Sequence, residues 1–131
     1  MGRRAAVIVS GGGSISPFTT PDAACGQGLA AGSTDTALRA ALLRSGIETY
    51  TAPVRIGPGE VIEDLGWSGF AEPPFVLPAN MTIDSVGEVE ESASALARFL
   101  GYLHETRDID AVDLVAHSLG GVISRSAIMR L

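Results

Sequence analysis

A serine, Ser118, stands between a short apolar run and a helix-like pattern near the end of this 131-residue chain. The run V-D-L-V-A at 112–116 predicts a buried strand, and the residues after Gly120-Gly121 have the apolar spacing of a helix. The serine would lie at the apex of a sharp turn, with its hydroxyl held clear of the sheet. The first turn of the following helix offers free backbone N–H groups and a positive dipole end, which suit a developing oxyanion. These residues therefore predict nucleophilic attack by a serine on a carbonyl group.

The residues two before and two after Ser118 are small, which lets a helix and a strand approach closely. The sequence A-H-S-L-G-G at 116–121 resembles the nucleophile elbow of α/β-hydrolase lipases and esterases, whose pattern is G-x-S-x-G. Ala116 replaces the first glycine, a variant also found in some small bacterial lipases. The resemblance implies that Ser118 is the catalytic nucleophile and that the Leu119 N–H is one donor of the oxyanion hole. The alternative is a surface serine in a glycine-rich turn, which needs neither the strand nor the helix.

Three glycines follow the first apolar run of the chain. Ala5–Ser10 predicts a parallel strand covered on both faces, and Gly11-Gly12-Gly13 would let the backbone come close to a bound group. In the resembling lipases this position carries a His-Gly motif, and the residue after its glycine donates an oxyanion-hole N–H. Ser10 stands in place of the histidine and Gly11 matches the glycine, so the resemblance makes Gly12 the donor.

A phosphate-binding loop is the competing interpretation of these glycines. A Walker loop needs a lysine, and the chain contains none, while a dinucleotide fingerprint needs a helix that begins at the glycines. Residues 14–34 instead hold two prolines and many small polar residues, which is loop chemistry. The sequence therefore does not favour nucleotide binding, and the serine chemistry requires no metal and no organic cofactor.

Composition limits the class of protein. The net charge is −6, and the nine basic residues are all arginines scattered along the chain, so no basic patch for nucleic acid is expected. No apolar run approaches the roughly 18 residues of a membrane span, and the one near the N-terminus is too short for a signal peptide. The single cysteine, Cys25, excludes an internal disulfide. These features leave the compartment unassigned.

The elements that would position this site alternate along the chain. Besides the two strands already named, the pattern predicts a helix over Asp35–Ser45, a strand over Ile47–Ala52 and a helix from Ser85 to about Thr106. One α/β domain with a parallel sheet follows from this order. The resemblance adds the spatial order of second strand, first strand and elbow strand, and so implies the N-terminal part of an α/β-hydrolase fold.

Caps and apolar stripes define the two helices. Gly46 fits the C-terminal glycine of the first helix, whose start can be capped by Ser33, Thr34 or Asp35. Its apolar stripe consists of Leu38, Ala41 and Leu42. Ser85 and Glu88 form a capping box for the second helix. Its apolar face recurs every three or four residues, at Val86, Val89, Ala93, Leu96, Leu100 and Leu103.

The segment Pro53–Asp84 interrupts this rhythm, because it holds five of the seven prolines together with Trp67, Phe70 and Phe75. The prolines predict a long loop, while the aromatic residues argue against a fully solvated linker. Two interpretations remain open. The segment packs over the edge of the sheet, or it forms a wall or cover over an acyl pocket.

The resembling hydrolases carry their triad in the order serine, acid, histidine, and no residue after Ser118 is Asp, Glu or His. His117 is adjacent to the nucleophile and should point away from it, and His104 lies upstream, near the end of the second helix. His104 is expected there as a partner of the helix dipole. Since the chain also stops inside its last predicted helix, we expect the N-terminal half of a longer hydrolase or a remnant that binds without turnover.

The leading hypothesis is therefore a serine ester hydrolase of the lipase or esterase type that acts through an acyl-enzyme on a small-molecule ester or lipid. The 131-residue chain alone is expected to be inactive. Acyl transfer, as in an acyltransferase or a thioesterase, would use the same residues. A non-catalytic module that binds an acyl ligand or a protein is the hypothesis from another class. The unpaired edge of the elbow strand also predicts self-association.

Overall fold

The computed structural model describes residues 3–10, 34–70, 73, 75–117 and 119–131. In this part of the chain, three parallel strands form one sheet in the order β2-β1-β7. They are β1 (Arg3–Val9), β2 (Thr49–Thr51) and β7 (Ile109–Ala116). The helices are α2 (Thr34–Arg44), α3 (Val89–Arg107) and α4 (Leu119–Ile128). The predicted α/β class and the order of the three strands are confirmed.

Strand β1 is the centre of the sheet. Its residues from Ala5 to Val9 are at most 4% exposed, as expected of a continuous apolar run covered on both faces. On one side Val7 lies opposite Tyr50 of β2, and on the other side opposite Leu114 of β7. The prediction that the run at 112–116 is a buried strand is wrong, because Val112, Leu114 and Val115 of β7 are only partly buried. Strand β7 lies at the edge of the described sheet.

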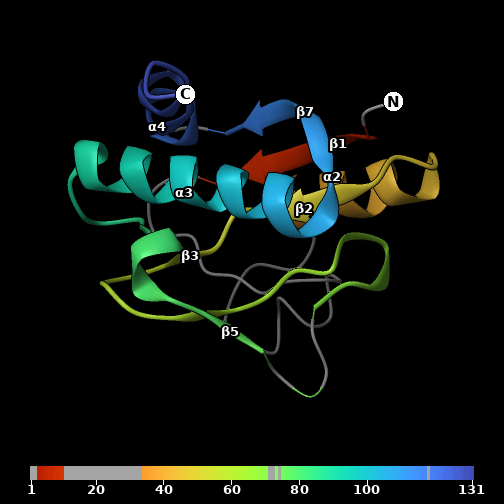
Figure 1. Ribbon diagram of the computed structural model, residues 1–131, viewed down its shortest axis with the longest axis horizontal. Helices are drawn as coiled ribbons and strands as arrows, with labels where there is room; N and C mark the ends of the chain where they lie inside the picture. The colour runs from red at the N-terminus through yellow and green to blue at the C-terminus, as the bar shows by residue number, and fades with distance from the viewer. Residues whose placement is uncertain (1–2, 11–33, 71–72, 74, 118) are drawn as a thin grey trace.

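The helices cover opposite faces of the sheet. Tyr50 and Ala52 belong to the core cluster with α3, whereas Thr51, between them, accepts a hydrogen bond from Arg39 of α2. Since successive side chains of a strand point to opposite faces, α2 and α3 lie on opposite sides, as right-handed crossovers require. In Figure 1, α3 runs across the front of the sheet and α4 is seen end-on beside the N-terminal half of α3. The main core lies between α3, α4 and the sheet.

Helix α2 ends as predicted but buries a different face. Gly46 has φ +81°, and the N–H groups of Gly46 and Ile47 donate to the carbonyls of Leu43 and Leu42, which is a Schellman motif. The predicted apolar stripe is not the buried face, because Ala41 is exposed while Arg39 is 1% exposed. Arg39 is buried by an ion pair described below. The predicted caps at 33–35 lie outside the described residues and side chains.

The capping box predicted at Ser85 and Glu88 is wrong. Helix α3 begins at Val89 with Glu88 as its N-cap, and no side chain caps it. The Ser85 hydroxyl donates to the Arg55 carbonyl instead, at 3.1 Å. A turn at Asp84 holds this segment away from the helix, since its Oδ1 accepts the N–H of Val86 at 3.1 Å. The predicted stripe is otherwise buried or partly buried from Val89 to Leu103, while Val86 is 65% exposed.

The segment 53–84 contains short regular elements. Two pairs of strands form in it: β3 (Val54–Arg55) with β6 (Ile83–Asp84) in parallel, and β4 (Val61–Ile62) with β5 (Val76–Leu77) in antiparallel orientation. Two single turns of 3-10 helix are η1 (Gly66–Ser68) and η2 (Ala79–Met81). Val54, Leu77 and Ile83 belong to the core cluster, so the segment packs against the domain. Its interpretation as a cover over an acyl pocket stays a prediction.

No helix among the described residues combines the length and the apolar character needed to cross a membrane.

Candidate active site

The carboxyl ends of β1 and β7 meet the start of α4. The His117 N–H donates to the Val9 carbonyl at 3.0 Å, which extends the pairing of the two strands by one residue. The Gly120 N–H donates to the His117 carbonyl at 3.0 Å and closes the turn. Since β7 ends at Ala116 and α4 begins at Leu119, only two residues separate strand from helix. The predicted strand, tight turn and helix are present.

Of the three predicted site residues, the structure describes only Leu119. Ser118, the predicted nucleophile, and Gly12, a predicted oxyanion donor, lie outside the described residues. Leu119 is the first residue of α4, and its side chain is partly buried against the core. The N–H groups in the first turn of a helix have no partner within that helix, so Leu119 has the backbone position that an oxyanion donor requires.

Gly120 holds the start of α4 directly against the end of β1. A Cβ added at Gly120 would lie 2.1 Å from the Val9 carbonyl oxygen and 3.1 Å from that of Ser10. Only glycine allows this approach, because the obstacle is backbone that no change of side-chain rotamer can move. The next residue, Gly121, would meet nothing within 4 Å. The close approach of the Val9 and Ser10 carbonyls therefore explains why the last position of the G-x-S-x-G pattern is a glycine, Gly120.

His104 lies at the other end of β7 from the candidate site. Its Nδ1 is 3.0 Å from the Ile109 carbonyl oxygen and 3.3 Å from the Asp110 carboxylate, at the C-terminal end of α3. From Ile109 to Ala116 the strand rises by about 23 Å, at roughly 3.3 Å per residue. His104 is therefore too far from the turn at 117–119 to act as a base there.

Charged side chains at the amino ends of the strands form internal networks. Glu48 accepts two hydrogen bonds from Arg3, at 2.6 and 2.7 Å, and one from the Tyr50 hydroxyl at 2.5 Å. Glu63 accepts from Arg107 at 2.6 Å and from the Tyr102 hydroxyl at 2.5 Å. Burial, together with the Glu48 hydrogen bond, raises the pKa of the Tyr50 phenol. These groups stabilise the end of the sheet opposite the candidate site.

A buried ion pair connects α2 with the segment after β4. Arg39 and Asp64 are 1% and 2% exposed, and two nitrogens of the guanidinium contact the two carboxylate oxygens. The Asp64 carboxylate also accepts the N–H groups of Thr51 and Gly66, and the guanidinium lies 4.9 Å from the centre of the Phe70 ring. Burial raises the pKa of Asp64, while these hydrogen bonds lower it. With every oxygen engaged internally, the pair is structural.

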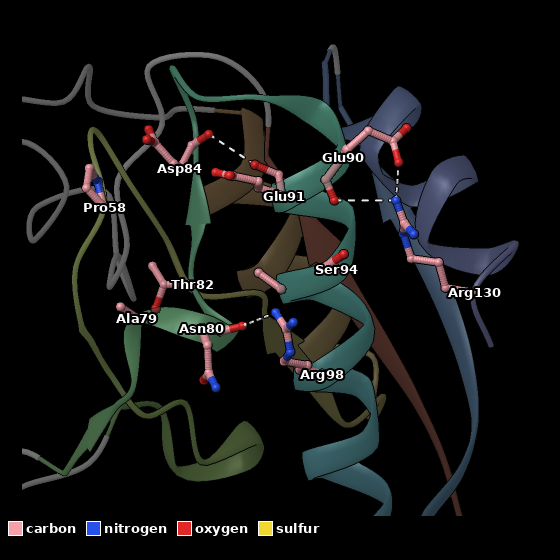
Figure 2. Close-up of a pocket in the computed structure, with 12 residues that line it drawn as sticks. Pro58, Ala79, Asn80, Thr82, Asp84, Glu90, Glu91, Ser94, Arg98 and Arg130 are labelled. Atoms are coloured by element: carbon pink, nitrogen blue, oxygen red, sulfur yellow. Dashed lines mark hydrogen bonds and ion pairs between the residues drawn. The ribbon is translucent and has the colours of Figure 1, made fainter.

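A surface hollow of about 410 Å³ lies beside α3 and carries charges of both signs (Figure 2). Four of the charged side chains that line it, Asp84, Glu90, Arg98 and Arg130, are engaged within the protein. Arg98 donates to the Asn80 carbonyl at 3.0 Å, Arg130 pairs with the Glu90 carboxylate, and Asp84 accepts backbone N–H groups. The hollow contains none of the residues of the turn at 117–120. It is therefore not favoured as the active site.

In the described ranges, no group of three or more His, Cys, Asp or Glu side chains is placed to hold a metal ion. Comparison of the chain with models of protein families, with curated proteins and with solved structures finds no match. The strand–turn–helix at 109–128 and the contact of Gly120 with β1 are therefore the basis for a functional proposal.

Proposed function

We propose that this chain carries the nucleophile and the oxyanion donors of a serine ester hydrolase of the α/β-hydrolase type, similar to lipases and esterases. The single observation that carries the proposal is the contact of Gly120 with Val9 and Ser10. This contact brings the N-terminus of α4 against the residues that lead into Gly11-Gly12. A nucleophile at 118 and N–H donors from Gly12 and Leu119 would then converge on one carbonyl group.

In the proposed reaction, the Ser118 hydroxyl oxygen attacks the ester carbonyl, and the N–H groups of Gly12 and Leu119 stabilise the oxyanion of the tetrahedral intermediate. Collapse of the intermediate releases the alcohol and leaves an acyl-enzyme, which water hydrolyses. A histidine must take the serine proton, because a free serine hydroxyl is a weak nucleophile. His104 is too far away, and His117 is the covalent neighbour of the nucleophile, so neither is assigned as the base. The mechanism requires no metal and no organic cofactor.

A fluorophosphonate probe tests the nucleophile, because only a serine activated by a base reacts readily with it. In the protein produced from its complete reading frame, the probe should label Ser118, and Ser118→Ala should lose the label and reduce turnover by about 10⁴-fold or more. Ser126→Ala, on the same helix but outside the turn, is the matched control and should keep the label. Labelling that survives Ser118→Ala would place the nucleophile elsewhere.

The 131-residue chain by itself should show no ester hydrolysis above background, because His104 is too far from the turn and His117 is not assigned as the base. Residual catalysis from oxyanion donors alone is too slow to separate from spontaneous hydrolysis of a p-nitrophenyl ester. The measurement is initial rate against chain concentration, for the parent chain and for Ser118→Ala. Turnover that is present in the parent and absent in the variant would contradict this prediction and require His117 to be tested as the base.

A further inference from the structure

We draw no further inference here: the strongest candidate, the apolar groove of about 550 Å³ beside the edge of β7 that no strand in the described part of the chain pairs with, carries nothing, because the described residues do not show what covers it.

Discussion

An Arg39→Met variant of the chain is expected to lose about 3–5 kcal/mol of its free energy of unfolding. The change removes the cation from a pair whose members are 1% and 2% exposed, so the Asp64 carboxylate stays buried without its counter-charge. Domains of this size have total stabilities of about 5–15 kcal/mol, so the loss is a large fraction. The melting temperature should fall by about 10 °C or more. Urea unfolding followed by circular dichroism measures the difference.

Arg130→Met is the control for this experiment. Arg130 pairs with Glu90, whose side chain is 75% exposed, and an exposed pair contributes about 1 kcal/mol or less. The double variant Arg39→Met/Asp64→Asn removes both charges and keeps a side-chain oxygen near the N–H groups of Thr51 and Gly66. It should therefore be more stable than Arg39→Met alone. A double variant no more stable than the single one would contradict the assignment of the loss to an uncompensated charge.

The stability deficit of Arg39→Met should also depend on pH. Burial raises the pKa of Asp64, and the hydrogen bond from Arg39 is the largest of the effects that lower it. Removing Arg39 therefore leaves the pKa of Asp64 higher still. The folded variant then holds a proton that the unfolded chain releases, and its stability falls as the pH rises through that raised pKa. The deficit should therefore be smaller at pH 5 than at pH 8. In the double variant, which has no ionisable group at position 64, this difference should disappear.

Local sequence patterns were enough to predict the first strand, the end of the first helix, and the strand and helix on either side of Ser118. The apolar run before Ser10 gives β1, and Gly46 gives the end of α2 by its left-handed φ of +81°. The strand and helix on either side of Ser118 follow from their apolar spacing. The order β2-β1-β7 came from the family resemblance, and the structure agrees with it.

Long-range contacts explain what the sequence patterns missed. Arg39 is not part of the predicted apolar stripe of α2, and its burial depends on Thr51 and Asp64, which lie 12 and 25 residues further on. The Ser85 hydroxyl has its partner 30 residues upstream, at the Arg55 carbonyl, so the capping motif is used for a tertiary contact. A sequence window contains neither partner. The rule that helix caps and stripes follow local sequence therefore fails where a distant polar group competes.

At the candidate site, too, the local sequence predicts part of the arrangement and only the fold explains the rest. The pattern A-H-S-L-G-G indicates that Gly120 should be small, but the reason lies in Val9 and Ser10, more than a hundred residues earlier in the chain. Only the fold brings the end of β1 to that glycine. The roles of Ser118 and Gly12 remain predictions, because both residues lie outside the described part of the chain.

Gly120→Ala is the variant that connects this fold to the proposed chemistry. The new methyl group would lie 2.1 Å from the Val9 carbonyl oxygen, so α4 would have to move by roughly 1 Å to restore an ordinary contact. Such overpacking should cost about 1–3 kcal/mol. In a protein that turns over, the displaced Leu119 N–H should lower kcat about 10²-fold, because an error of 1 Å in positioning is enough for a loss of this size.

Gly121→Ala is the matched control, since a Cβ there meets nothing within 4 Å and α4 already continues through this residue. Alanine is favoured over glycine inside a helix by about 0.5–1 kcal/mol, so this variant should be slightly more stable than the parent. Two adjacent glycines, given the same substitution, should thus shift the urea midpoint in opposite directions. If Gly120→Ala matched Gly121→Ala in stability and in the rate of fluorophosphonate labelling, α4 would not be held against β1. The convergence of nucleophile and oxyanion donors at this point would then lose its support.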